Sequence, residues 1–201
     1  MKTARSTTDV ALLERFAATF CVLDETIAFG DGDPAAAALA VGPIDEYGWR
    51  RWEPRAVRTP PSALAPLYQK LPARFPPLYE ELVLSYRWAR VDLGLVTLLA
   101  NPIAPDLSGL GTEIFSDPGL VETLVPNGLL QFGRAGVVDY DPICFDIRAR
   151  GKGGEAPVVR VDHEQVLCHR RLRTRPVAST FRVLVDEIIA KAAQARAAKD
   201  G

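Results

Sequence analysis

The sequence has few cysteines, almost no net charge and no long apolar run. Its 201 residues include three cysteines, Cys21, Cys144 and Cys168. This odd, widely spaced set argues against a disulfide framework and favours a reducing compartment. A net charge of −1 supplies no overall field that would steer the chain onto nucleic acid or an anionic membrane. No apolar run is long enough to span a bilayer, and residues 1–10 lack the apolar core of a signal peptide. We therefore expect a soluble, cytoplasmic protein that binds neither nucleic acid nor membranes.

The composition is otherwise that of an ordinary globular protein. Hydrophobic residues make up 48% of the chain and charged residues 24%, which excludes a wholly disordered chain. A length of 201 residues is sufficient for one domain with a substantial core and is short for two. We expect a single domain over residues 1–201.

The clearest secondary-structure signal is a pair of strands in the second half of the chain. Apolar Ile143, Phe145 and Ile147 alternate with Cys144, Asp146 and Arg148, which is the period-two pattern of a strand with one buried face. The alternation returns at Val159 and Val161 after a glycine-rich loop, residues 149–155, whose glycines suit a reversing turn. Two strands so closely joined are expected to be antiparallel neighbours, and other elements must cover their apolar face.

Helical patterns flank this hairpin on both sides. Helices are predicted by apolar spacing, by prolines at their first turns and by glycines or prolines at their ends; the predicted ranges are 7–27, 35–40, 61–70, 76–88, 117–125 and from 176 onward, with a fraying tail from Lys191. The other segments are predicted to be a strand at 91–99, irregular structure at 42–61, a turn-rich connection at 101–111, and either a short helix or a final strand at 162–172. This order predicts an α+β fold, with a central, mainly antiparallel sheet packed with helices.

Four groups of short motifs follow one another in a familiar order. They are Leu71-Pro72 with Leu78-Tyr79-Glu80; Gln131-Phe132-Gly133 with Pro142-Ile143-Cys144-Phe145-Asp146; Pro157-Val158-Val159 with Asp162-His163-Glu164; and Ala178-Ser179-Thr180-Phe181 with Leu184. Their order resembles the SMI1/KNR4 (SUKH) superfamily over residues 65–190. Residues 1–64 lie outside the resemblance and are expected to form an N-terminal helical extension and loop. Residues 85–92 depart from the family pattern, because an asparagine-glycine turn is expected there.

The resemblance implies a function in protein binding rather than catalysis. Members of the superfamily share an α+β fold without known catalysis or cofactor, and in bacteria they often neutralise a polymorphic toxin. The partner-binding surface varies between members, so the resemblance assigns no binding residue. The expected function is therefore a non-catalytic, immunity-like module that occludes its partner. A regulatory scaffold without a toxin is one alternative, and a small hydrolase that uses His163 and neighbouring acids is another.

Two segments supply candidate partner-binding residues. Arg170, Arg171, Arg173 and Arg175 crowd into six positions, and arginine is common among interface hot spots. Such a run can also be a solvated face paired with local acids. The second segment, residues 47–52, holds Trp49 and Trp52. These tryptophans could stack on nucleic-acid bases, but pinning a long loop to the body is the simpler interpretation.

Side chains that could support metal binding or catalysis gather near the predicted hairpin. The acids and metal-ligand types are Asp139, Asp141, Asp146, Asp162, His163, Glu164, Cys144, Cys168 and His169. Their spacing lacks the paired ligands of a zinc site, and the chain has neither a nucleophile elbow nor an H-E-x-x-H motif. Residues 151–154, Gly-Lys-Gly-Gly, lack the spacing of a phosphate-binding loop and favour a hairpin turn. We therefore expect no catalytic residue, metal or cofactor.

Overall fold

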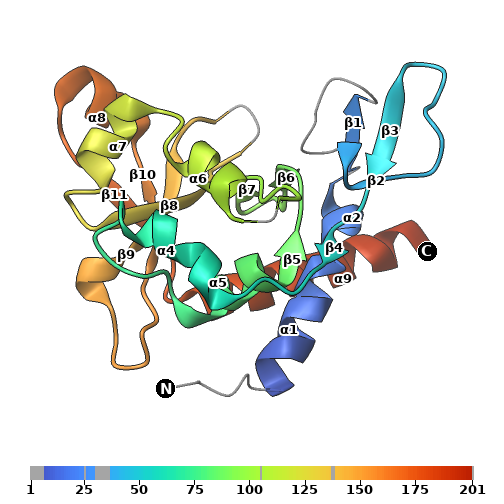
Figure 1. Cartoon of the computed structure of the whole chain (residues 1–201), viewed down its shortest axis with the longest axis horizontal. Coiled ribbons are helices and arrows are strands. Elements are labelled where there is room, and N and C mark those ends of the chain that lie inside the picture. Colours follow the sequence, from blue (N-terminus) through green and yellow to red (C-terminus); the bar gives the residue numbers. More distant parts are fainter. Residues whose placement is uncertain (1–6, 25, 30–36, 105, 137–138, 201) are drawn as a thin grey trace.

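The fold is α+β, as the sequence predicts, with a six-stranded antiparallel sheet packed between helices (Figure 1). The computed structural model describes residues 7–24, 26–29, 37–104, 106–136 and 139–200. The sheet comprises β6 (Val91–Asp92), β7 (Thr97–Leu98), β8 (Leu129–Arg134), β9 (Pro142–Asp146), β10 (Val158–Val161) and β11 (Thr174–Ala178). Neighbours in the sheet are also neighbours in the chain, so the six strands form a meander.

The predicted central hairpin is confirmed as β9 and β10. The two strands are antiparallel, with Val158 opposite Phe145 and Val159 opposite Cys144. The glycine-rich loop between them closes through the amide of Gly151, which donates to the carbonyl of Glu155 at 2.9 Å. Gly154 has a φ of +80°, a conformation that glycine adopts without strain. The Gly-Lys-Gly-Gly segment is therefore a turn.

Helices lie on both sides of the meander (Figure 1). The α-helices and the two 3₁₀ turns are α1 (Thr7–Ala17), α2 (Phe20–Leu23), η1 (Pro61–Leu64), α4 (Ala65–Tyr68), α5 (Pro77–Ser85), α6 (Ser108–Ile114), α7 (Pro118–Leu124), η2 (Ile147–Ala149), α8 (His163–His169) and α9 (Phe181–Asp200). The starts of the helices predicted at 61, 76 and 117 are confirmed. At α7 the sequence signal is explicit, because Asp117 caps the helix by accepting from the amide of Leu120 at 3.1 Å.

The main core is aromatic and lies between the sheet and α1, α5 and α9. Phe132 of β8 stacks on Phe145 of β9, with ring centroids 4.1 Å apart. Phe181 of α9 meets both of these rings edge-on. It also meets the ring of Tyr79 of α5 edge-on, with ring centroids 5.3 Å apart. Aromatic pairs in these geometries contribute about 0.5–1.5 kcal/mol each beyond their buried area. This cluster fixes α9 against the sheet.

The opposite face of the sheet is also covered, which corrects the prediction of one buried face. Cys144, Leu129 and Val161 are fully buried on that face. They pack in a second cluster with Leu120 and Leu124 of α7 and Val166 of α8. Because Cys144 packs there as a small apolar residue, the alternation with Ile143 and Phe145 separates two cores rather than a core and solvent.

Two strands, β3 (Trp49–Trp52) and β4 (Arg55–Ala56), lie in the region 42–61 that was predicted to be irregular, and each joins a small sheet. The first sheet pairs β3 with β1 (Ile27–Phe29) and β2 (Ala40–Val41), and the second pairs β4 with β5 (Tyr86–Arg87). The prediction of irregular structure at 42–61 is therefore wrong over these strands. The predicted helix at 35–40 falls partly outside the described residues, and its last residue, Ala40, begins β2.

Two predicted helices end earlier than expected because side chains and turns compete with the helical pattern. The helix predicted at 7–27 breaks after Ala17, and the hydroxyl of Thr19 donates to the carbonyl of Phe16 at 2.7 Å. The helix predicted at 76–88 ends at Ser85. The carbonyl of Val83, in its last turn, accepts from the side chains of Arg87 (2.7 Å) and Asn101 (3.0 Å). These bonds replace the backbone partners that the carbonyls at a helix end lack.

Several other segments differ from the prediction in their boundaries. The strand predicted at 91–99 is a hairpin of β6 and β7, turning at Gly94 with a φ of +75°. Helix α6 begins within the predicted connection at 101–111. The last helix begins at Phe181 rather than near Pro176, because residues 174–178 add β11 to the sheet. It continues as a helix beyond Lys191, with Ala192 buried, so the predicted fraying tail is wrong there.

Candidate functional site

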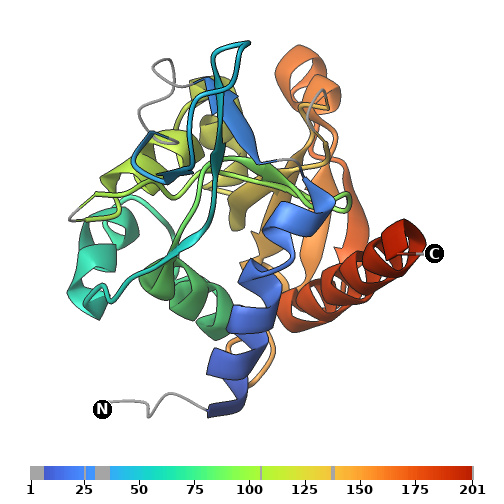
Figure 2. The same ribbon diagram turned by 90° about the vertical axis from the view of Figure 1, so that its right-hand side faces the viewer.

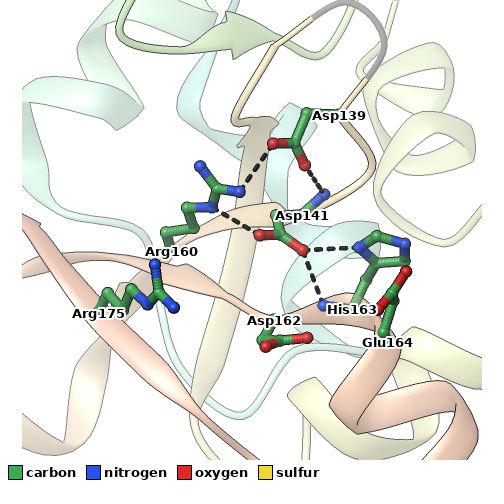
Figure 3. Close-up of a pocket in the computed structure, with 7 residues that line it drawn as sticks. All are labelled: Asp139, Asp141, Arg160, Asp162, His163, Glu164 and Arg175. Atoms are coloured by element: carbon green, nitrogen blue, oxygen red, sulfur yellow. Dashed lines mark hydrogen bonds and ion pairs between the residues drawn. The ribbon is translucent and has the colours of Figure 1, made fainter.

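A network of charged side chains joins the segment before β9 to β10 and to the start of α8 (Figure 3). Its centre is Asp141, which is buried. One carboxylate oxygen of Asp141 accepts from Nε of Arg160 at 2.6 Å. The other accepts from both the backbone amide (2.9 Å) and Nδ1 (2.6 Å) of His163. Arg160 also donates to Asp139 at 2.7 Å, so one guanidinium holds two aspartates.

The electrostatics of this network favour the ionised forms of Asp141 and Arg160. Burial opposes ionisation of Asp141, but hydrogen bonds from His163 and Arg160 outweigh that effect and lower the pKa of the carboxyl group. The hydrogen bond that Arg160 donates to Asp141 in turn raises the pKa of Arg160. We call the network of Asp139, Asp141, Arg160 and His163 the clamp. At neutral pH it joins β10 to the segment before β9 by ion pairs.

The clamp lies beside a cleft of about 300 Å³. Its lining residues are Asp139, Asp141, Arg160, Asp162, His163, Glu164 and Arg175. Asp162 caps α8 by accepting from the amide of Gln165 at 3.0 Å. Sequence reasoning selected all but one of these residues, and the fold brings them together. The exception is Arg160, which was not singled out from the sequence. An arginine between Val159 and Val161 on a buried strand is nevertheless a signal of a buried or partly buried charge.

The clamp orients His163 in the manner of a general base but has no companion nucleophile. Hydrogen bonding of Nδ1 to Asp141 leaves Nε2 as the other ring position. The seven lining residues include no serine, threonine or cysteine, which are the usual activated nucleophiles. These hydrogen bonds fix the start of α8 to the segment before β9, and a hydrolytic reaction in the cleft would need water as its nucleophile.

A cation would fit this cluster poorly as it stands. Asp139, Asp141 and His163 each offer a ligand atom, and these atoms lie within 4.8 Å of one another. However, Arg160 already pairs with both carboxylates, and its positive charge lies where a cation would have to be stabilised. Displacing it would break two charge-assisted hydrogen bonds.

The remaining candidate ligands lie elsewhere. Asp146 pairs with Arg148 at 2.8 Å, and Cys144 is buried against α7, where burial raises the pKa of its thiol. Cys168 and His169 are exposed at the end of α8. The cysteines and histidines therefore do not form one site in the described part of the chain.

The four clustered arginines form a continuous exposed edge, which we call the arginine edge: Arg170, Arg171, Arg173 and Arg175. The edge runs from the end of α8 into β11, the last strand of the sheet. All four side chains are exposed, and within the described structure none of their guanidinium groups has a hydrogen-bond or ion-pair partner. In contrast, Arg74, Arg90, Arg148, Arg160 and Arg182 each pair with a carboxylate. The partner-binding role expected of these arginines stays a prediction.

Arg170 holds an unusual backbone conformation. It is the C-cap of α8, with φ of 54° and ψ of 32° in the left-handed region. Its amide donates to the carbonyl of Val166, and the next amide, of Arg171, reaches back to Gln165 at 2.9 Å. Glycine is the usual residue in this conformation, and it would be less strained at position 170 than the arginine that the chain has there.

The two candidate tryptophans do not belong to the arginine edge. Trp52 is 2% exposed and belongs to the core, so its prediction as a partner-binding residue is wrong. Trp49 is 36% exposed and lies on β3. Figure 1 shows β3 at the opposite end of the longest axis from α8, so one compact partner surface could not include both.

The loop before β3 holds exposed apolar residues: Tyr47, which belongs to the aromatic segment singled out at 47–52, and Ile44, which was not singled out. Tyr47 is 72% exposed and Ile44 49% exposed. Asp45 orders this loop, because its carboxylate accepts from the amides of Tyr47 (2.9 Å) and Trp49 (2.8 Å). An aspartate three residues before a glycine is a recognisable signal of such ordering, but exposure of the aromatic ring follows from tertiary structure alone.

Comparisons with protein-family profiles, curated proteins and solved structures found no match to this chain. None of the helices in the described ranges is both long enough and apolar enough to cross a membrane. Functional inference therefore depends on the geometry of the cleft and of the arginine edge.

Proposed function

We propose that this protein acts by binding another protein, and that the arginine edge is the contact surface. The observation that carries the proposal is the set of four exposed guanidinium groups, none of which has a partner among the described residues. An arginine side chain can bury its apolar stem and form several hydrogen bonds at an interface, and arginine is enriched among the residues that dominate binding energy. The apolar side chain of Leu167 on α8 is 40% exposed close to this edge in the chain and adds an apolar contact.

The clamp supports this role by fixing the base of the edge. Asp141 holds the first residue of α8, and the amide of Asp162 donates to the carbonyl of Arg173 at 3.1 Å. The arginines therefore project from a held backbone rather than from a free loop. Preorganisation of this kind reduces the entropy that is lost when a partner binds.

An immunity-like function is the specific form of this proposal. It is supported by the resemblance of residues 65–190 to the SMI1/KNR4 superfamily, and it requires that the partner is a toxin that the chain occludes. A regulatory scaffold would use the same surface without a toxin. The two are separated by co-expressing the partner with or without this protein and measuring cell growth: rescue supports immunity, and a partner that is not toxic supports a scaffold.

The test of protein binding compares two double charge reversals. The edge variant carries Arg171→Glu and Arg173→Glu. The control carries Arg55→Glu and Arg58→Glu, which alter two other exposed arginines outside the edge. Tagged wild type and both variants are expressed in the native cells, and the proteins that co-purify are quantified. We expect a stoichiometric partner that the wild type and the control retain and the edge variant loses. A partner retained equally by all three, or no partner above background, would contradict the proposal.

A further inference from the structure

We propose that the arginine edge binds an acidic, extended segment of its protein partner, with the carboxylates of that segment paired to the guanidinium groups. This inference rests on the proposed function and adds the chemistry of the partner. It follows from the charge distribution, from the backbone of Arg170 and from the geometry of β11.

The arginine edge is a local concentration of positive charge. Residues 170–175 include four arginines and no acid. Because the whole chain has a net charge of −1, removing these four positive charges leaves −5 on the other residues. A patch of this sign on a body of the opposite sign attracts an acidic partner locally.

Two structural features indicate that the arginines are kept for a ligand rather than for the fold. Their guanidinium groups contribute no ion pair within the described structure, so they do not stabilise it through such contacts. In addition, Arg170 has a φ of 54°, which is unfavourable for any residue with a Cβ atom. A strained residue that makes no stabilising side-chain contact indicates a role outside the folded state itself.

The geometry of β11 favours recognition by side chains over addition of a strand. β11 is the last strand of the sheet and is paired with β10 alone. Pro176 lies within it and removes a backbone donor that a further strand would need. Arg173 and Arg175 are two positions apart and so project to the same side, about 7 Å apart. Acids at alternate positions of an extended segment have the matching spacing.

Nucleic acid is a poorer match to the same surface. Its phosphates form a uniform negative track along the backbone, and such a track would cross acids next to the edge. Asp162 and Glu164 line the cleft that Arg175 also lines (Figure 3). The carboxylates of a peptide lie on flexible side chains and can turn away from those acids, whereas the phosphates of a nucleic acid are part of its backbone.

The test measures binding of two defined polyanions by fluorescence anisotropy. The probes are labelled poly-L-glutamate and a labelled oligothymidylate of the same total charge, each titrated with wild type, the Arg171→Glu/Arg173→Glu variant and the Arg55→Glu/Arg58→Glu control. We expect poly-L-glutamate to bind wild type and control, and to bind the edge variant at least about tenfold more weakly, which corresponds to about 1.4 kcal/mol. Binding should also weaken as salt increases from about 0.05 to 0.3 M, because the pairs are exposed.

Three outcomes overturn the inference. Equal affinity of poly-L-glutamate for both variants would show that the edge is not its site. Tighter binding of oligothymidylate that also depends on Arg171 and Arg173 would assign the edge to nucleic acid. If the edge variant loses a co-purifying protein but poly-L-glutamate does not bind the wild type, protein binding stands and the acidic chemistry is wrong. A second edge variant with glutamine at both positions, and thermal unfolding of each protein, separates loss of charge from loss of fold.

Discussion

Replacing Arg170 by glycine should stabilise the fold while weakening binding at the arginine edge. Arg170 caps α8 in the left-handed region, with φ of 54°, and its guanidinium group has no partner in the described structure. Substitution by glycine removes the steric conflict of Cβ with the backbone, whereas alanine keeps it. Both substitutions remove the same charge from the helix end. The comparison of Arg170→Gly with Arg170→Ala therefore isolates the backbone contribution to stability.

The magnitude follows from two opposing contributions. Left-handed backbone costs a residue with a Cβ about 1–2 kcal/mol, and glycine relieves this cost. The greater freedom of glycine in the unfolded chain lowers the free energy of unfolding by about 0.4–1 kcal/mol and so offsets part of the relief. We therefore expect the free energy of unfolding of Arg170→Gly to exceed that of Arg170→Ala by about 0.5–1 kcal/mol. For a chain of this length, such a difference raises Tm by about 1–4 °C.

The assay is urea denaturation followed by circular dichroism, with differential scanning calorimetry as a second measurement. Equal denaturant slopes for the two variants would show that the difference lies in stability rather than in the unfolded state. A glycine variant less stable than the alanine variant would refute the positive φ at this position. In that case Arg170 would also not be retained at a cost to the stability of the fold. Affinity of both variants for poly-L-glutamate should fall together, because they lose the same charge.

Three further changes test the clamp, the sheet and the two cores. Asp141→Asn should lower the free energy of unfolding by about 1.5–3 kcal/mol at pH 7, because charge-assisted hydrogen bonds are lost. Since the pKa of Asp141 is lowered in the folded state, its stabilisation is present above about pH 4 and lost as pH falls through the folded pKa. A difference in the free energy of unfolding between wild type and variant that stays constant down to about pH 2 would contradict this. Gly133→Ala should cost about 1–3 kcal/mol in urea denaturation, because its Cβ would lie 2.4 Å from a valine methyl group and 2.9 Å from a backbone carbonyl of β7, whereas Gly153→Ala, with open space around it, should be close to neutral. In native protein, a maleimide should label exposed Cys168 before buried Cys144, and mass spectrometry of peptides would detect the reverse order if the second core is open.

The central hairpin was predictable because its signal is local. Ile143, Phe145, Val159 and Val161 carry a period-two pattern, and the loop between them carries glycines. The burial of Cys144 was not predictable from the same pattern. A cysteine is compatible with either face of a strand, and only the position of α7 and α8 decides that this face is a second core.

The short strands and the ends of α5 depend on contacts between distant residues. A strand of two residues, such as β5, has no periodic pattern, and Tyr86 there continues the helical spacing of Leu78 and Leu82. Arg87 and Asn101 supply side-chain donors to the carbonyl of Val83 in the last turn of α5. Propensity cannot anticipate a buried arginine that serves a helix end from the next strand.

The candidate site was predictable in its composition and not in its connections. Asp141 and His163 were both singled out as chemistry-bearing residues, but they are 22 positions apart, and the register of β9 and β10 brings them together. The arginines were recognisable as a cluster, whereas their lack of partners follows only from the placement of every nearby acid. Trp52 shows the converse, since its aromatic character suggests an interface and the fold buries it.

The contact between α1 and α9 has a consequence for synthesis of the chain. Phe16 of α1 meets Phe181 of α9 with ring centroids 6.2 Å apart, and both views of the ribbon place the two helices side by side (Figure 2). These residues are separated by 165 positions, so at about 5–20 residues per second the first helix waits roughly 8–33 s for its partner. Phe145 of the meander precedes Phe181 by only 36 residues, so its aromatic face waits for α9 for about 2–7 s. We therefore expect nascent chains to be most prone to aggregation in this short interval, when Phe132 and Phe145 are made but the last helix has not yet covered them.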